Sequence, residues 1–306
     1  MTMKNGAHAP RPPLGLEKVE MAFRDALQGV FGRLDWLPVA DGAIHRFHVP
    51  GDRAGSLNGW YVLFADSATA GAFGSWKTGE THHWSGGGKV SSDGVNQMRE
   101  RIEQARRQRE AEQHQRQLDA AVRAGRAWES SEPAPADHPY LARKRVVPHR
   151  LRRQGDVLLV PLYADGYLCN LQRIAADGEK RFLAGGRVKG AYSPIGSLEP
   201  GGRLYICEGW ATGATIHAET GAAVACAMNA GNLLEVGRQL QRDHPDALLI
   251  FAGDDDRQTP GNPGRTAAMA AALAAGALVT FPDWPDDAPP TLSDFNDLAR
   301  WRLAHE

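Results

Sequence analysis

The 306-residue sequence has no long apolar run and few cysteines. No stretch of about 18 consecutive apolar residues occurs, and the polar, proline-rich start Met1–Gly15 lacks an apolar segment, so we expect neither a membrane-spanning helix nor a secretory signal. The three cysteines lie far apart in apolar, strand-like runs, which excludes a disulfide framework and a zinc knuckle. They are Cys169, Cys207 and Cys226. We therefore expect a cytoplasmic protein with buried, reduced thiols.

A phosphate loop of the form Gly-x4-Gly-Lys-Ser/Thr is also missing. Gly88-Lys89 is followed by Val90 and has no glycine at the required upstream position. The sequence thus contains no helicase motor, and we expect any unwinding of a duplex to come from a separate protein.

The net charge of −1 conceals an uneven distribution of charge along the chain. Arg143–Lys189 contains eleven basic and four acidic residues, whereas Gln241–Glu306 contains five basic and eleven acidic residues. The first region favours anions and the second favours cations. This pairing suits an enzyme that holds a polyphosphate or a nucleic-acid backbone beside a divalent metal, although solvated charge runs would give the same composition.

The first half of the chain predicts a small α+β module and a helical linker. Behind a flexible tail (1–15), apolar residues at helical spacing predict a helix over Leu16–Phe31. Short apolar runs between glycine-containing turns, from Ile44 to Trp84, predict an antiparallel sheet and complete a module at 16–95. Asn96–Trp128 is polar and rich in helix formers, so residues 96–137 are expected to be a linker that ends in a proline-containing segment.

The second half predicts a hairpin followed by parallel βαβ units. Val157–Tyr163 and Leu168–Ile174, joined by Ala164-Asp165-Gly166, have the pattern of a hairpin in a basic subdomain (138–202). In 203–306, four short apolar runs alternate with helical stretches, which predicts a parallel sheet with flanking helices. The four runs are Leu204–Cys207, Ala223–Met228, Leu248–Ala252 and Ala277–Phe281. Ligands of such sheets bind beyond the carboxyl ends of the strands.

Acidic residues follow three of these strands. Glu208-Gly209 follows the first run, Asp254-Asp255-Asp256 follows the third, and Asp294 lies in the segment after the last. Carboxylates gathered at one edge repel one another unless a cation compensates them, so we predict a divalent metal site with Glu208, Asp254, Asp256 and Asp294 as ligands. Oxygen ligands favour Mg²⁺ or Mn²⁺ over zinc. Because alternate residues leaving a strand point to the same side, Asp254 and Asp256 are expected to face the site and Asp255 to face away.

This pattern resembles the Toprim domain shared by DnaG-type primases, topoisomerases and some nucleases, in which a Glu-Gly pair follows one strand and Asp-x-Asp follows a later one. Leu158–Ser197 resembles the basic subdomain that precedes Toprim in primases. Its candidate residues for binding nucleotide and template are Arg173, Lys180, Arg181, Arg187 and Lys189. The resemblance implies an α/β catalytic core with a Toprim-type parallel sheet.

The stretch from Ile44 to Gly79 also resembles the front module of phage and conjugative-plasmid primases. Related primases often carry a cysteine-ligated zinc there, but this sequence has no cysteine before Cys169, so no zinc is expected. His45, His48, His82 and His83 offer a weak alternative ligand set. Trp60, Tyr61 and Trp76 are candidates for stacking on bases of the template, or else for forming the core of the sheet.

The resemblance implies a DNA primase that joins nucleoside triphosphates into short primers on single-stranded DNA, with Glu208, Asp254 and Asp256 as catalytic residues and a separate replicative helicase as a partner. Two alternatives stay open. One is a Toprim nuclease, since the same carboxylates can support phosphodiester cleavage. The other is a non-catalytic, single-strand-binding replication accessory that has kept the fold. Neither the template start sequence nor the preference for ribo- or deoxynucleotides follows from the residues.

Overall fold

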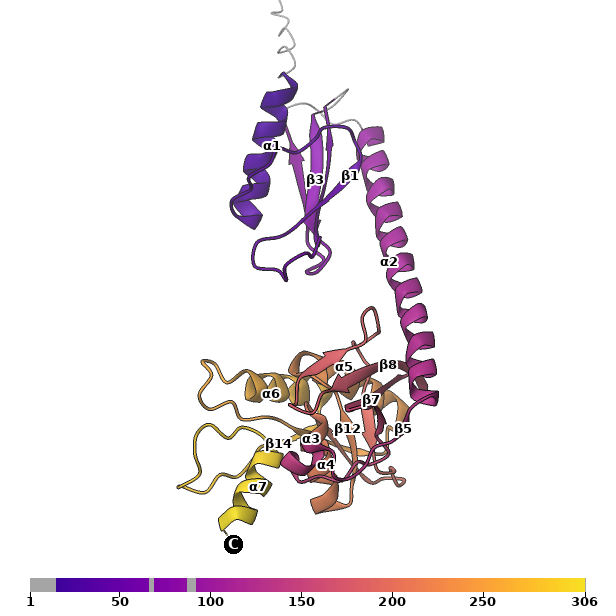
Figure 1. Cartoon of the computed structure of the whole chain (residues 1–306). Helices are drawn as coiled ribbons and strands as arrows, with labels where there is room; N and C mark the ends of the chain where they lie inside the picture. The colour runs from indigo at the N-terminus through magenta and orange to yellow at the C-terminus, as the bar shows by residue number, and fades with distance from the viewer. Residues whose placement is uncertain (1–14, 66–68, 87–91, 306) are drawn as a thin grey trace, which may run out of the picture. The chain divides into compact units, whose positions relative to one another are not determined.

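The computed structural model describes residues 15–65, 69–86 and 92–305. Residues 1–14 of the predicted tail and Gly88-Lys89 lie outside these ranges. The chain divides into two compact units, Met1–Ala111 and Glu112–Glu306. Helix α2 (Ser92–Glu129) is one continuous helix that contributes to both units (Figure 1). No helix within the described ranges is both long and apolar enough to cross a membrane.

Unit 1 contains the predicted helix and a four-stranded antiparallel sheet. Helix α1 (Leu16–Phe31) has the predicted bounds. The strands are β1 (Ile44–Phe47), β2 (Gly59–Phe64), β3 (Ala70–Ser75) and β4 (Thr81–Ser85), hydrogen-bonded in the order β1-β2-β3-β4. Every residue of β3 is buried, because the sheet is covered on both faces.

The two faces of this sheet pack against different helices. Phe23 and Leu27 of α1 pack with Tyr61 and Phe73 on one face. Trp60 and Val62 point to the opposite face, because successive side chains of a strand alternate, and Ile102 of α2 packs against them there. The first part of α2 is therefore a structural part of unit 1.

The second part of α2 belongs to the core of unit 2. Ala124 is completely buried and forms a cluster with Leu159 and Leu171, against which Trp128 also packs. Arg123 and Arg152 add hydrogen bonds at this contact, from Arg123 Nη2 to the carbonyl of Ala184 (2.6 Å) and from Arg152 Nη1 to the carbonyl of Trp128 (2.7 Å). The predicted linker 96–137 therefore needs correction: Ile102 packs in unit 1 and Ala124 packs in unit 2, whereas the sequence suggested a solvated spacer.

Unit 2 begins with an antiparallel sheet that contains the predicted hairpin. Its strands are β5 (Glu132–Pro133), β6 (Arg152–Gln154), β7 (Val157–Ala164), β8 (Tyr167–Ile174) and β9 (Lys180–Phe182), hydrogen-bonded in that order. The short helix α3 (Pro139–Lys144) lies between β5 and β6 in the sequence. Asp165-Gly166 forms the turn of the hairpin with positive φ at both residues, as tight two-residue turns require.

The second sheet of unit 2 has the order β10-β12-β11-β13-β14. Its strands are β10 (Ser193–Ile195), β11 (Arg203–Cys207), β12 (Ala223–Cys226), β13 (Leu248–Ala252) and β14 (Leu278–Thr280). The last four are parallel, which confirms the predicted βαβ units. The edge strand β10 runs antiparallel to β12, so the sheet is mixed. Three residues are too few for an apolar pattern to reveal such a strand.

Helices cover both faces of the mixed sheet. They are α4 (Trp210–Thr220), α5 (Leu233–Asp243), α6 (Pro263–Ala275) and α7 (Phe295–His305), with a 3-10 turn η1 (Ala230–Asn232) before α5. Leu204 and Ile206 of β11 face the cluster formed with α5 and α6, while Cys207 faces α4. Helix α7, which packs against α4, was not predicted, because charged residues interrupt its apolar residues.

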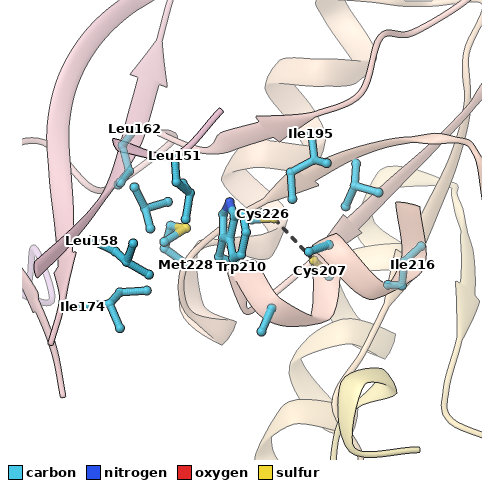
Figure 2. Packing of buried hydrophobic residues seen from close by; sticks show 14 of the residues in the cluster. Leu151, Leu158, Leu162, Ile174, Ile195, Cys207, Trp210, Ile216, Cys226 and Met228 are labelled. Atoms are coloured by element: carbon cyan, nitrogen blue, oxygen red, sulfur yellow. Dashed lines mark hydrogen bonds between the residues drawn. The ribbon is translucent and has the colours of Figure 1, made fainter. Parts of the chain in front are cut away.

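One hydrophobic cluster joins the two sheets of unit 2. Trp210, which is 1% exposed, lies in its middle, with Leu158 and Leu162 of β7 on one side and Cys207 and Cys226 on the other (Figure 2). The two sulfur atoms are 3.9 Å apart and both thiols are free. Cys207 and Cys226 are buried as predicted, whereas Cys169 is only partly buried. The basic subdomain and the mixed sheet thus share a core.

Candidate active site

Three predicted carboxylates line one cavity at the carboxyl edge of the mixed sheet. Glu208 directly follows β11 and Asp254 comes shortly after β13, and these strands are parallel neighbours with Cys207 opposite Ala252. Asp294 lies immediately before α7. The three carboxylates line a cavity of about 280 Å³ that also receives Lys144 and Lys180. The fold therefore gathers residues that are distant in the sequence at a strand end, where ligands of α/β sheets bind.

Burial and mutual repulsion raise the pKa values of all three carboxylates. The pKa of Asp254 rises to about 8, first because burial penalises its charge and then because Asp294, Glu208 and Asp256 repel it. Burial is also the largest cause of the raised pKa of Glu208 and of Asp294. One carboxylate oxygen of Asp254, Oδ1, is buried without a hydrogen-bond partner. This site holds negative charge that the surrounding protein does not fully compensate.

Two lysines supply part of the compensation. Lys144 Nζ lies 3.5 Å from Asp297 Oδ1 and 4.0 Å from Asp294 Oδ2. The pKa of Lys180 is lowered, first by desolvation and then by Lys144, although Asp294, Asp254 and Glu208 act in the opposite direction. Two cations beside clustered carboxylates can attract a phosphate and still leave the carboxylates free to bind a metal.

Asp255 and Asp256 have different surroundings from Asp254. Asp255 is 7% exposed, and its carboxylate accepts hydrogen bonds from Asn262 Nδ2 (2.7 Å), Arg265 Nη1 (3.3 Å) and Trp284 Nε1 (3.1 Å). It therefore stabilises the loop between β13 and α6. Asp256 Oδ2 accepts from the backbone N–H of Gly264 in the first turn of α6 (2.9 Å). Asp256 does not line the cavity, but its charge contributes to the raised pKa of Glu208.

The donor set fits a hard divalent cation. It consists of carboxylate oxygens with raised pKa values, one of them buried and unpaired, and cations of this kind take oxygen ligands. No group of three or more His, Cys, Asp and Glu side chains within the described ranges is already arranged to hold a metal ion. These carboxylates would therefore have to move closer together around a cation, as flexible side chains at strand ends can do.

The predicted basic residues are dispersed in the structure. Of the five, Lys180 alone lines the cavity. Arg181 pairs with Glu179, at 2.6 Å from Nη2 to Oε1, and Arg187 pairs with Asp165, at 2.8 Å from Nη1 to Oδ2. Arg173 lies opposite Arg181 on neighbouring strands. Lys189 is exposed in the loop before β10. Alternation along β9 separates Lys180 from Arg181, and Arg187 and Lys189 follow this strand in a loop, so the dispersion depends on a pairing that the sequence does not reveal.

Two of the three aromatic residues predicted to stack on bases are buried in unit 1. Trp60 is 1% exposed and Tyr61 is 4% exposed, and the Tyr61 hydroxyl accepts a hydrogen bond from the Val39 N–H (3.0 Å). The stacking role is therefore wrong for both in this structure, because helices cover both faces of the sheet. Trp76 is partly exposed. Its ring stacks on Trp60, and the Arg109 guanidinium lies 5.6 Å from the centroid of the Trp76 ring.

The histidines of unit 1 make separate contacts. His45 Nε2 lies 2.9 Å from Asp41 Oδ1, His48 Nδ1 lies 3.0 Å from the Ser56 carbonyl, and His82 stacks on Phe73. Each of these three imidazoles therefore contacts a different residue.

Sequence reasoning missed Lys144 and Asn296. Lys144 ends α3, far from the acidic motifs in the sequence, and only the packing of α3 beside α7 brings it to Asp294 and Asp297. Asn296 is 1% exposed, and its Nδ2 donates to the Lys144 carbonyl (2.8 Å) and to Thr215 Oγ1 (2.9 Å). This asparagine links α3, α4 and α7. The signal in the sequence that could have identified Asn296 is its position between the acidic residues Asp294 and Asp297.

Comparison with known families finds a match to the part of the chain that contains the parallel strands. Residues 203–305 match the family described as Toprim domain. This part of the chain is a Toprim domain. The acidic cavity lies where its two central strands, β11 and β13, end.

Two curated relatives extend the similarity beyond the Toprim domain. A protein named DNA primase TraC from Escherichia coli is 34% identical over 272 residues, which is 83% of this chain and 26% of the relative. A second Escherichia coli protein of the same name is 35% identical over 258 residues, or 80% of this chain and 18% of the relative. The chain thus spans about a quarter and about a fifth of the length of these relatives. Since unit 2 begins at Glu112, both alignments include part of unit 1.

Among solved structures, one described as the Aquifex aeolicus primase, zinc-binding and RNA polymerase domains, aligns with 95% of this chain and 84% of its own at 13% identity. The TM-score is 0.35, so the fold described above rests on the topology of the chain itself.

Proposed function

We propose that the chain is a DNA primase that synthesises short primers on single-stranded DNA by transferring nucleotides from nucleoside triphosphates. The similarity of 34% over 83% of the chain to DNA primase TraC carries this proposal, because it reaches from the Toprim domain into unit 1. The acidic cavity with its two lysines supports it, since phosphoryl transfer requires charge compensation at the phosphates and at the attacking oxygen.

Glu208, Asp254 and Asp294 would hold the divalent cation, either Mg²⁺ or Mn²⁺, and the charge of Asp256, outside the cavity, would add to the negative potential at Glu208. A cation bound there lowers the pKa of a coordinated hydroxyl and neutralises charge on phosphate oxygens. Asp254 must lose its proton to act as a ligand, so metal binding competes with its pKa of about 8.

Lys180 and Lys144 would bind the triphosphate. Both line the cavity, Lys180 from β9 and Lys144 from α3. Their ammonium groups reach phosphate oxygens as mobile point charges. Arg173, Arg181, Arg187 and Lys189 lie outside the cavity, and in this proposal they contact the template backbone, with a strength that falls as salt rises. A separate replicative helicase would supply the template, in the cytoplasm where the nucleotides are.

Incubation of the protein with single-stranded DNA, labelled nucleotides and magnesium tests the proposal. A primase produces short new oligomers, a Toprim nuclease shortens the template, and a binding accessory does neither. Separate reactions with labelled ribo- and deoxynucleotides establish the substrate preference. Failure to form oligomers with either set, on a mixture of template sequences and with either Mg²⁺ or Mn²⁺, would contradict the proposal.

A further inference from the structure

A second cavity of unit 2 is separate from the acidic one. It has a volume of about 390 Å³, which is within the range of small-molecule sites. Trp128, Tyr163 and the edge strand β10 contribute to its walls. Within the described ranges, Trp210 alone lines both cavities. Trp210 is 1% exposed and lies in the shared core (Figure 2), so a buried side chain contributes to both linings.

The lining of this second cavity favours an anion. No carboxylate is among its lining residues, whereas the acidic cavity has three. His149, Arg150 and His217 contribute two imidazoles and one guanidinium. Arg150 makes no ion pair or hydrogen bond in the described part of the chain. Ser193, at 1% exposure, adds a buried hydroxyl to the wall.

His149 carries an unused hydrogen-bonding atom at this cavity. Its Nε2 is buried and has no partner. The nearby His217 donates from Nδ1 to the Ala222 carbonyl (2.7 Å), so a neutral His217 has a free acceptor at Nε2. The two rings are edge to face with centroids 5.2 Å apart. A buried polar atom without a partner is costly, so a ligand that supplies one gains affinity.

The backbone holds the two residues His149 and Arg150 in an unfavourable conformation. Their φ angles are +39° and +66°, a left-handed region that side chains other than glycine rarely adopt. Two successive residues of this kind aim an imidazole and a guanidinium at one cavity, and strain of this sort is found at ligand sites.

We propose that this cavity is a second, non-catalytic nucleotide site that binds a nucleoside phosphate, with the base against Trp128 and Tyr163 and the phosphate at His149 and Arg150. The aromatic residues provide area for a base, and the guanidinium provides a charge-assisted hydrogen bond for a phosphate. Both parts of the ligand find complementary chemistry within one cavity. The site does not depend on the metal chemistry of the Toprim domain.

Calorimetric titration of the full chain in EDTA provides the test, because without divalent cations the acidic cavity repels anions. Adenosine, adenosine 5′-monophosphate and inorganic phosphate are the probes. We expect the monophosphate to bind about tenfold more tightly than adenosine, owing to the charged hydrogen bonds. Adenosine binding without any gain from the phosphate would contradict the proposed phosphate position.

The variant Arg150→Gly has a matched control in Arg145→Gly. Both arginines are exposed and left-handed, with φ of +66° and +52°, but Arg145 does not line the cavity. Glycine suits this conformation, so both variants should fold. Arg150→Gly should bring the affinities for the monophosphate and adenosine together, while Arg145→Gly should leave their ratio unchanged.

Asp254→Asn separates this site from the proposed catalytic site. If the nucleotide binds in the second cavity, this variant binds the monophosphate as the wild type does, even when primer synthesis is lost. Loss of binding in Asp254→Asn would assign the ligand to the acidic cavity and overturn the proposal. So would the absence of saturable binding at millimolar nucleotide, or an affinity ratio that survives Arg150→Gly.

Discussion

Asp254 combines an unpaired buried oxygen with three neighbouring carboxylates. Its charge is penalised by burial and by Asp294, Glu208 and Asp256, and Lys180 offsets only part of this penalty. A carboxylate in such surroundings lowers the stability of the free protein, and it is useful only when a cation or a proton compensates it. This opposition between stability and function can be measured.

The stability of the metal-free protein should fall as pH rises through Asp254 titration. The pKa of Asp254 in the folded protein is about 8, against an ordinary value of 3.8 for an aspartate. Between these two values the unfolded chain releases the proton while the folded chain retains it, so the free energy of unfolding decreases with increasing pH, and the loss is complete above the folded pKa. We expect the free energy of unfolding to decrease by a few kcal/mol, as an order of magnitude, across this pH range. Thermal denaturation in EDTA at several pH values measures it.

The variant Asp254→Asn should reduce this pH dependence and raise the melting temperature at pH 8, because a neutral amide replaces the penalised charge. It should also abolish primer synthesis and lose the stabilisation that added Mg²⁺ gives the wild type. A variant that is less stable than the wild type at pH 8 in EDTA would show that Asp254 is compensated by groups other than those described.

In contrast to Asp254→Asn, Asp255→Asn should lower the stability and retain primer synthesis. Its carboxylate accepts hydrogen bonds from Asn262, Arg265 and Trp284, so the amide loses a charge-assisted interaction and one acceptor oxygen. We expect a cost of about 1–3 kcal/mol in the free energy of unfolding, with primer synthesis retained at temperatures where the variant is folded. Denaturant titration and the primer assay, run side by side, separate the two aspartates. A stable but inactive Asp255→Asn would place this residue in the catalytic site.

At the scale of helices and strands, the sequence predicts the long apolar elements of unit 2 and helix α1 well. Apolar runs such as Leu248–Ala252 are buried in any parallel sheet, so local pattern decides their structure. The carboxylates Glu208 and Asp254 could be assigned to the site for the same reason, since Glu208 directly follows one such strand and Asp254 comes two residues after the end of another.

The features that were not predicted correctly from the sequence depend on contacts between distant segments. Trp60 and Tyr61 have an alternating pattern that fits an exposed stacking face as well as a core, and only the second helix against the sheet buries both. Lys144 joins the acidic cavity through the packing of α3 near α7. The short edge strand β10 is determined by its pairing with β12. None of these contacts leaves a periodic signal.

Helix α2 provides a test for a single element, because two of its alanines differ in burial. Ala124 is completely buried in the core of unit 2, at 0% solvent exposure, whereas Ala111 is exposed to solvent. Ala124→Asp buries an unpaired charge and should lower the stability of unit 2 by roughly 3 kcal/mol or more. Ala111→Asp, with the same helix propensity change, should cost well under 1 kcal/mol. Equal effects, measured by denaturant titration, would mean that α2 is only a spacer.

At the scale of the whole molecule, the two units can be separated within α2. Residues from Glu112 onward form unit 2, including Ala124 and Trp128, which pack against the hairpin sheet. A fragment 112–306 should therefore fold with its acidic cavity intact. A shorter fragment 133–306 removes that packing and the hydrogen bond from Arg152 to the Trp128 carbonyl, so it should be less stable by several kcal/mol.

The fragment 112–306 also tests the division of labour between the units. Trp76 of unit 1 is partly exposed and lies beside Arg109, and a role in holding the template requires such a surface. If unit 1 holds the template, the fragment should bind single-stranded DNA more weakly and start primers poorly, while it still extends a supplied primer. Full-length protein and fragment should be compared on bare and on pre-primed templates at one fixed salt concentration, since phosphate contacts make affinity depend on salt. Because the fragment 112–306 retains the packing of α2, an equal loss of activity on both templates would mean that unit 1 supports catalysis itself, and full activity on both would remove unit 1 from primer synthesis.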